Sequence, residues 1–510
     1  MLNSFEMFIR ERYNVMNVSK ITEAANQKLV QRMSSMKVYI LPFVILAIIF
    51  SLGISSILRA NFYYIDDFGR AYAGYTGWEH YSRFLAVYLS NFIHADNYLM
   101  DISPLPQLIA VLIMAGAGIM LLHIITGKHS YTVGHFMAVI PLALSPYFLE
   151  CLSYKYDSPY MALSVFVSVF PFIYSAAGDR KFVIASIVGT ISMCMTYQAS
   201  AGIYPLLALL LGVKGWNSGK KVIESIKFMA VSAGSYIAGL LVFRLFIMEE
   251  VDGYSSTEMV SADNFTNTVI DNYTKYINYL LNDYRVEWLL LMACLCLCFI
   301  YVSVRYSQKN KWMSLLVISG SVVIMFLLAF GVYPFLSKPG FAPRCMYGIG
   351  VFIAVVGICV ADSPKVYLGK LAGFLLGWMF FVFSFSYGNA LFMQGQYTEY
   401  RMELVVDDLV ANGFIEKDAK ILTRITGSIG YAPAIENAPA DYDALRRLVP
   451  VTFRDSTWYW GHYGFTRYYD LDNLQVTAQD IPLDEQLPLI SDNAFHTIRG
   501  NQEFLWIDLH

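Results

Sequence analysis

The sequence has little charge. Only 15% of its 510 residues are Asp, Glu, Lys or Arg, whereas an average soluble protein has about 25%. The formal net charge is -3 with no long run of one sign, which argues against a nucleic-acid-binding surface. In contrast, 56% of the residues are hydrophobic and 16% are aromatic. This composition indicates a protein whose surroundings are largely lipid.

The polar parts of the chain, where a disulfide framework would be expected, contain few cysteines. The seven cysteines lie mostly in apolar segments and the polar C-terminal region has none, so we expect no disulfide-stapled domain. Cys294, Cys296 and Cys298 alternate at a spacing that spreads them around a helix, and we expect no metal site there. The first 37 residues lack the apolar core and cleavage site of a secretory signal, so the first apolar segment should be retained.

Apolar stretches fill most of residues 38–389, which we expect to form a transmembrane catalytic body. A helix needs about 20 apolar residues to cross the hydrocarbon core of a bilayer. Residues 182–213 are too long for one such helix and contain the polar break Tyr197-Gln198-Ala199-Ser200, which predicts two short helices. The other predicted spans lie near residues 38–58, 99–125, 130–149, 160–177, 225–248, 287–305, 313–333, 345–361 and 371–389. The sequence therefore predicts a mainly α-helical polytopic membrane protein with about eleven transmembrane helices.

The positions of the basic residues predict how the chain is oriented in the membrane. Lys and Arg in short loops are retained in the cytoplasm, and with eleven spans every strongly basic loop falls on one side. Residues 1–37 are then a cytoplasmic amphipathic tail, and the C-terminus is periplasmic. Residues 390–510 should form a small α/β periplasmic domain, with a helix at 395–412 and strands at 420–426 and 504–509.

Two adjacent carboxylates, Asp66 and Asp67, follow the first span in a loop with Arg70. Such a pair is costly near lipid unless it is solvated or paired. One aspartate could take a proton from a substrate hydroxyl while the other orients a hydroxyl or holds a cation. Alternatively, the two could cap a loop helix and pair with Arg70. Tyr64 and Trp78 nearby offer flat faces for a sugar ring, although membrane interfaces are equally rich in such residues.

A second polar cluster contains Lys155 and Asp157, in a short loop between two spans on the outer face. Its ionisable groups should face a crevice, unless Lys155 and Asp157 simply neutralise one another. Gln198, at the polar break, would lie at a similar depth. Irregular backbone in a membrane protein is tolerated only where it is buried or lines a cavity, which favours a site.

A third cluster contains Lys338 and Arg344, on an outer loop with little acid nearby. Because this runs against the usual charge bias, a local anion such as a lipid phosphate is the simplest explanation. The alternative is that both side chains contact lipid headgroups. We expect Asp66 and Asp67 to share an outward-facing cavity with these two cations.

The polar motifs resemble those of the serotype-converting O-antigen glucosyltransferases of bacteria and their phages, up to about residue 215. The motifs are Tyr64-Ile65-Asp66-Asp67-Phe68-Gly69-Arg70, Gly74-Tyr75-Thr76-Gly77-Trp78, Asp101-Ile102-Ser103-Pro104-Leu105-Pro106-Gln107, Tyr156-Asp157-Ser158-Pro159-Tyr160-Met161-Ala162-Leu163 and Tyr197-Gln198-Ala199-Ser200. The resemblance implies a C-type membrane glycosyltransferase of the bacterial inner membrane. It implies a polyprenyl-phosphate-linked hexose, glucose, as donor and an O-antigen hydroxyl as acceptor.

The resemblance also implies roles for the residues above. Asp66 or Asp67 would activate the acceptor, and a divalent cation is left open as a cofactor. The phosphate of the donor would be bound by Arg70, Lys338 and Arg344. The sugars would be contacted by Tyr64, Trp78, Glu79, Lys155, Asp157 and Gln198. A flippase for lipid-linked sugars, a polysaccharide ligase or polymerase, and a non-catalytic scaffold are the competing hypotheses, and fold analogy alone does not separate them.

Overall fold

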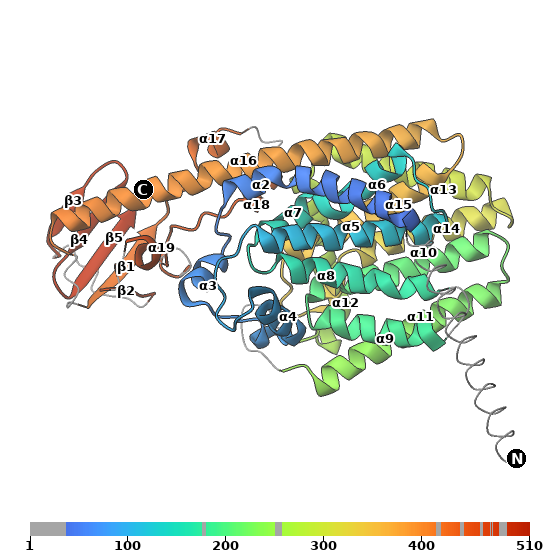
Figure 1. The fold of residues 1–510 in the computed structure, drawn as a ribbon, viewed down its shortest axis with the longest axis horizontal. Coiled ribbons are helices and arrows are strands. Elements are labelled where there is room, and N and C mark those ends of the chain that lie inside the picture. Colours follow the sequence, from blue (N-terminus) through green and yellow to red (C-terminus); the bar gives the residue numbers. More distant parts are fainter. Residues whose placement is uncertain are drawn as a thin grey trace, which may run out of the picture.

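The computed structural model shows an elongated helical bundle with a small β-sheet beyond one end (Figure 1). It describes residues 37–175, 180–249, 258–414, 420–438, 443–458, 463–469, 471, 473–478 and 487–510. The predicted cytoplasmic tail therefore lies, except for its last residue, outside the described residues.

The bundle consists of helices, most of which run roughly parallel or antiparallel to one another (Figure 1). They are Lys37–Gly53, α5 (Leu105–Thr126), α6 (Val133–Leu144), α7 (Pro146–Ser153), α8 (Ser158–Val169), α9 (Arg180–Cys194), α10 (Ile203–Asn217), α11 (Val222–Phe246), α13 (Val286–Arg305), α14 (Lys311–Leu328), α15 (Gly348–Asp362) and α16 (Tyr367–Ala411). The connections contain the short helices α2 (Ser55–Ala60), α3 (Asp67–Ala73) and α4 (Phe84–His94), and the longer α12 (Phe265–Asp283). They also contain the 3-10 turns η1 (Glu79–Tyr81), η2 (Phe170–Tyr174), η3 (Gln198–Gly202), η4 (Ala262–Asn264), η5 (Tyr333–Phe335) and η6 (Pro343–Cys345).

Within the described residues, six helices are long and apolar enough to cross a membrane: α5, η3 with α10, α11, α13, α14 and α16. A seventh span results if α6 and α7, bent by 57° at Ser145, are counted together. The predicted number of eleven is not confirmed, because predicted spans such as 38–58, 160–177 and 345–361 form apolar helices of only 10–17 residues. Apolar composition marks a buried helix as well as a spanning one: almost every residue of α15 is buried.

The predicted break within residues 182–213 is confirmed. Helix α9 ends at Cys194, Tyr197 is extended, and η3 begins at Gln198. A glycine is required here, because a Cβ on Gly202 would lie 1.8 Å from the backbone oxygen of Leu328. The break therefore packs directly against the end of α14.

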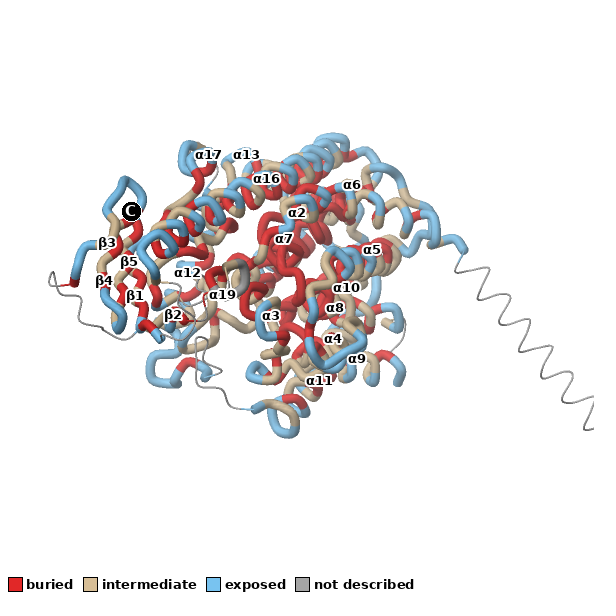
Figure 2. The backbone as a smooth tube through the Cα atoms, turned by 60° about the vertical axis from the view of Figure 1, so that its left-hand side comes forward, coloured by how far each residue is buried: buried red, intermediate tan, exposed pale blue. Residues whose placement is uncertain are grey.

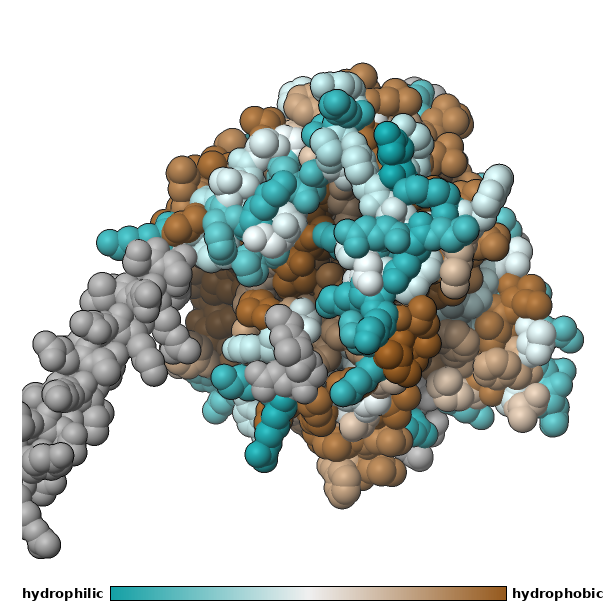
Figure 3. Space-filling model, turned by 90° about the vertical axis from the view of Figure 1, so that its right-hand side faces the viewer, coloured by the Kyte–Doolittle hydropathy of each residue, from teal (hydrophilic) through white to brown (hydrophobic). Residues whose placement is uncertain are grey.

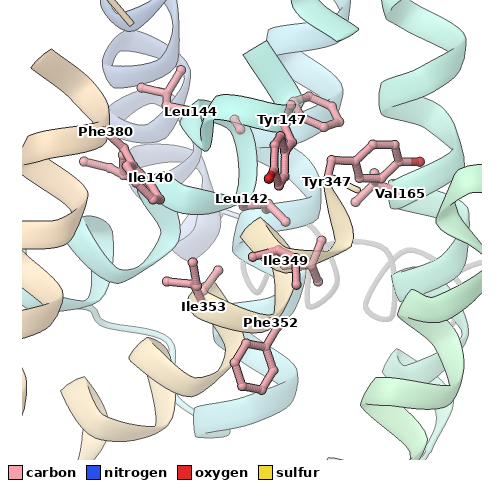
Figure 4. Packing of buried hydrophobic residues seen from close by; sticks show 14 of the residues in the cluster. Ile140, Leu142, Leu144, Tyr147, Val165, Tyr347, Ile349, Phe352, Ile353 and Phe380 are labelled. Atoms are coloured by element: carbon pink, nitrogen blue, oxygen red, sulfur yellow. The ribbon is translucent and has the colours of Figure 1, made fainter. Parts of the chain in front are cut away.

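The core of the bundle surrounds α7, all of whose residues are buried (Figure 2). Figure 4 shows side chains of this core, where Tyr147 of α7 lies among aliphatic and aromatic residues of neighbouring helices. By contrast, only 22% of the most apolar stretch of α11 and of α13 is buried, compared with 72% for η3 with α10. Helices α11 and α13 are therefore peripheral, with apolar faces available to lipid.

The C-terminal region is a mixed five-stranded sheet, as the predicted strands indicated. The strand order is β2 (Leu474–Val476), β1 (Ile421–Gly427), β5 (Phe504–Leu509), β4 (His496–Gly500), β3 (Leu489–Asp492). Strand β1 is parallel to β2 and β5, whereas β4 is antiparallel to β5 and β3. Short helices α17 (Pro433–Glu436), α18 (Asp443–Leu448) and α19 (Tyr463–Tyr469) complete the region.

Helix α16 joins the bundle to this sheet without interruption (Figure 1). The predicted domain boundary at residue 390 thus falls inside a helix. Arg401 is buried where α16 reaches the sheet and donates hydrogen bonds to the carbonyl oxygens of Phe495 at 2.6 Å and His510 at 2.8 Å. The sheet is therefore held to the same rigid helix that packs along the bundle.

Candidate active site

A cavity of about 560 Å³ lies where the loop after α2, helix α7 and the turn η6 meet the C-terminal region. Of the residues that the structure describes, four arginines and two acids contribute to its wall: Arg344, Arg446, Arg447, Arg454, Asp66 and Glu150. Its aromatic lining is Tyr64, Tyr81, Tyr431 and Trp458. An excess of cations over acids, together with aromatic faces, suits an anionic ligand that carries a ring.

Asp66 reaches this cavity because the chain turns sharply just before it. Ile65 has a left-handed backbone, with φ at 46°, and Asp66 occupies the position just before α3, with no capping hydrogen bond from its side chain. Its side chain is 36% exposed, and its Oδ2 lies 3.8 Å from Nη1 of Arg70. Burial raises the pKa of the Asp66 carboxyl above its usual value, and the positive charges of Arg70 and Arg344 oppose that rise.

Asp67 has a different environment from its neighbour. It is fully buried, and its Oδ2 accepts hydrogen bonds from the backbone N–H groups of Tyr64 and Lys155, both at 3.0 Å. Burial raises the pKa of the Asp67 carboxyl to about 8. Asp67 does not line the cavity. It joins the loop after α2 to the connection between α7 and α8.

Arg70 and Asp157 are partners of each other. Nη1 of Arg70 lies 2.6 Å from Oδ2 of Asp157, and the Trp78 indole N–H donates to Oδ1 of Asp157 at 2.5 Å. The Arg70 guanidinium also lies over the Trp78 ring, 4.6 Å from its centre. All three side chains are buried and none lines the cavity. They form a buried layer that supports Asp66.

The remaining predicted contacts of the first two clusters lie outside this cavity. Nζ of Lys155 donates to Asn61 at 2.6 Å and pairs with Asp101 at 3.1 Å. Glu79 accepts a hydrogen bond from a nearby threonine hydroxyl. Gln198 is placed elsewhere, hydrogen-bonded to Arg83 at 3.0 Å. Of the residues predicted to contact sugars, only Tyr64 reaches the cavity wall.

Arg344 is brought to the cavity by Glu150. This glutamate is buried in α7 and accepts hydrogen bonds from the backbone N–H of Arg344 and, at 2.7 Å, from its Nη1. The rest of the guanidinium remains available, with the Arg344 side chain 23% exposed. Lys338 is exposed and does not line the cavity, so the structure unites Asp66 with Arg344 but with neither Asp67 nor Lys338.

The sequence model of the GtrII glucosyl transferases matches residues 55–355. The chain belongs to this family. Among curated proteins, it is 24% identical to a protein of Salmonella phage P22 over 475 residues, covering 91% of this chain and 96% of that protein. That relative is described as an uncharacterized 55.3 kDa protein in the region 5′ of gtrB. No solved structure matches the chain.

Membership in the GtrII family supports a transferase that takes a sugar donor and a glycan acceptor. The apolar helices are consistent with a membrane protein. The matched segment contains the paired aspartates, Glu150 and Arg344, and it ends before the three arginines of the C-terminal region.

Sequence reasoning missed those three arginines. Arg446 and Arg447 lie on α18, which docks on the bundle because the Tyr64 hydroxyl donates to the Leu448 carbonyl at 2.7 Å and Arg447 pairs with the buried Asp283. Arg454 lies over the Trp458 ring, 4.2 Å from its centre. The signal that drew attention to Arg344, a cation on a short outer loop with little acid nearby, does not extend to a long C-terminal region, so residue spacing gave no reason to single these arginines out.

No group of three or more His, Cys, Asp or Glu side chains in the described part of the chain could hold a metal ion. The arrangement offers instead one accessible carboxylate facing several guanidinium groups.

Proposed function

We propose that this GtrII family member transfers glucose from a polyprenyl-phosphate donor to a hydroxyl of O-antigen repeat units. The reaction would take place in the polar cavity, at the periplasmic face of the bacterial inner membrane. One observation carries the proposal: Asp66 and Arg344 line the same cavity. The first provides a base and the second a cation for a departing phosphate.

The chemistry is a displacement at the anomeric carbon of the donor. The acceptor oxygen forms a bond to that carbon, the bond to the phosphate oxygen breaks, and its electron pair leaves with the phosphate. Asp66 takes the proton of the acceptor hydroxyl, for which its raised pKa makes it a stronger base than an ordinary aspartate. Arg344 stabilises the negative charge that develops on the phosphate, so no acid is needed to protonate the leaving group.

The neighbouring residues act through these two. Glu150 orients Arg344 through two hydrogen bonds, and Asp67 holds the loop that carries Asp66. Arg70 and Asp157 form the buried pair beside Asp66 and are positioning residues in this proposal. Trp78, Glu79, Lys155 and Gln198 stay predictions as sugar contacts.

The orientation in the membrane is supported by the basic loops. Lys128 pairs with Asp362, Lys214 donates to the carbonyl of Ile125, and Lys309 donates to the carbonyl of Gly219. These contacts gather the basic loops at the end of the bundle away from the sheet, where Figure 3 shows hydrophilic side chains over much of the face. With that end cytoplasmic, the polar cavity and the C-terminal region are periplasmic.

The proposal is tested in cells that make the donor. The chain is expressed with enzymes that produce polyprenyl-phosphate glucose in a strain of defined O-antigen, and the lipopolysaccharide is analysed by mass spectrometry and linkage analysis. We expect one added glucose on the repeat units in cells with the wild-type chain. We expect none in cells in which the Asp66→Asn protein is present in the membrane at the same level. Unmodified O-antigen with the wild-type chain, or equal modification with both, would contradict the proposal.

A further inference from the structure

A second cavity, of about 550 Å³, adjoins the polar one, because Tyr81 lines both. Its walls come from the ends of α9 and α14, from η3 and from α11. The lining is predominantly apolar and includes Met193, Leu240, Phe243, Leu328, Val332 and Phe335. We call this cavity the apolar cleft.

The apolar cleft lies at the edge of the bundle. Helix α11, which supplies Leu240 and Phe243, is among the least buried long helices of the described chain. An isolated apolar cavity deep in a core needs no ligand, but one walled by a peripheral helix of a membrane protein is accessible to a lipid chain.

Arg83 lines the apolar cleft and makes polar and ring contacts there. Its Nε donates to Gln198 at 3.0 Å, and its guanidinium lies over the rings of Tyr197 and Tyr81, 4.6 Å and 5.0 Å from their centres. Gln198 is itself held by the carbonyl of Tyr81 at 3.0 Å. Arg83 forms no ion pair within the part of the chain that the structure describes.

Two other charged residues of the described chain, Arg244 and Glu249, line the apolar cleft. Among the described residues, the one hydrogen bond of Arg244 goes to the sulfur of Met248, at 3.6 Å. Within the described part of the chain, two guanidinium groups and one carboxylate give the wall of the cleft a net positive charge. That combination complements an amphiphile with an anionic head and a long hydrocarbon tail.

We propose that the apolar cleft binds the isoprenoid chain of the donor and that Arg83 binds its phosphate, so that the sugar enters the polar cavity past Tyr81. This inference rests on the proposed function and identifies the donor subsite. Arg83 takes the role that the sequence predicted for Arg70 and Lys338, neither of which lines either cavity. In this inference Gln198 fixes the direction of the Arg83 guanidinium, in place of the sugar contact that the sequence predicted for it.

The electrostatics agree with this geometry. Burial raises the pKa of Asp66, and among the positive charges that oppose the rise are both Arg344 and Arg83. The two guanidinium groups thus act on the same carboxylate from two cavities. In this proposal Arg83 and Arg344 share the phosphate of the donor, and the anomeric carbon of the donor lies on the side of Asp66.

The test uses the purified full-length chain in lipid nanodiscs and two series of glucosyl-phosphate donors, one with a long polyprenyl chain and one with a two-isoprene chain. Arg83→Gln should raise KM for the long donor about tenfold or more, because it removes a charge-assisted hydrogen bond, and should leave KM for the acceptor unchanged. Arg59→Gln, an exposed arginine that lines neither cavity, is the matched control.

A second experiment fills the apolar cleft with a larger side chain, which tests whether the cleft binds the isoprenoid chain of the donor. Leu240→Trp should lower transfer from the long donor at least several-fold more than from the short one, whereas Leu241→Trp, on the exposed side of the same helix, should not distinguish them. A photoreactive polyprenyl phosphate should label cleft residues, and excess polyprenyl phosphate should compete for that labelling better than phosphatidylglycerol. Equal competition would make the cleft a general phospholipid site and overturn the inference.

The two proposals fail in different ways. If Asp66→Asn abolishes transfer while Arg83→Gln and Leu240→Trp match the wild type with both donors, the proposed function stands and this inference is wrong. If the polyprenyl phosphate labels the cleft but the wild-type chain transfers no glucose, the proposed function is wrong.

Discussion

Asp66 and Arg344 line one cavity, although Asp66 follows α2 at the start of the bundle and Arg344 follows α14. Each is placed by a buried acid next to it in space or sequence: Glu150 holds Arg344, and Asp67 fixes the loop of Asp66. The proposed proton acceptor and the cation for the leaving phosphate therefore line the same cavity, and a different buried acid positions each of them.

The charge of Arg344 should set the pH dependence of transfer. Arg344→Gln removes a positive charge that lowers the pKa of Asp66, so that pKa rises. Because a base works only when deprotonated, the acidic limb of the kcat/KM profile should move to higher pH, and the maximal rate should fall by about 100-fold.

Arg344→Lys is the matched comparison, because it keeps the charge and a partner for the buried Glu150. It should lower the rate, since an ammonium lacks the two-pronged geometry of a guanidinium, but leave the acidic limb in place. An acidic limb at the same pH in Arg344→Gln and wild type would mean that Arg344 does not act on the base.

The C-terminal region should contribute to catalysis through Arg454. This residue lines the cavity and forms no ion pair among the described residues. Arg454→Gln should lower kcat/KM by about 10- to 100-fold, the usual effect of losing a hydrogen bond to a charged group. Arg499→Gln, on strand β4 away from the cavity, should behave like the wild type in the same assay. Equal rates for the two variants would show that Arg454 does not contribute to transfer.

Asp67 should influence stability more than transfer. Its pKa in the folded protein is about 8, above the ordinary 3.8, so the folded state keeps a proton that the unfolded state has lost between these values. The free energy of unfolding should therefore fall as pH rises from about 4 to about 8. Asp67→Asn keeps the oxygen that accepts the two backbone N–H groups, and it should flatten this dependence and retain transfer within about tenfold.

This is measured by thermal unfolding of the purified protein at several pH values, with transfer assayed alongside. A transfer loss in Asp67→Asn as large as that in Asp66→Asn would reassign the base to both aspartates.

A side chain at Gly202, at the break between α9 and α10, should destabilise the protein. A Cβ on Gly202 would lie 1.8 Å from the backbone oxygen of Leu328, whereas one on Gly320 of α14 would meet nothing within 4 Å. Gly202→Ala should lower the thermal unfolding temperature, at a cost of about 1–3 kcal/mol or more. Gly320→Ala should unfold at or above the wild-type temperature. Similar temperatures for the two variants would show that the break is not packed against α14 as described.

Local patterns predicted much of the fold. The polar break at Tyr197 and the strands at the C-terminus were readable because they depend on short stretches of sequence. The number of membrane spans could not be predicted, because an apolar segment such as α15 has the same composition whether it faces lipid or other helices. Helix α16 was split in the prediction because its character changes from apolar to amphipathic, although its backbone runs straight through.

The candidate site was predictable only in part. A carboxylate after the first span and a cation on a later loop could be found by their unusual positions. Which aspartate reaches the cavity depends on a left-handed turn at Ile65, and which cations join it depends on the docking of α18. Both are tertiary features that residue spacing does not contain.

The most direct test of the account is the transfer of labelled glucose from a synthetic polyprenyl-phosphate donor to O-antigen by the purified Asp66→Asn protein. The account predicts a loss of at least about 100-fold relative to the wild type, with unchanged thermal unfolding. Transfer by Asp66→Asn at the wild-type rate would contradict it.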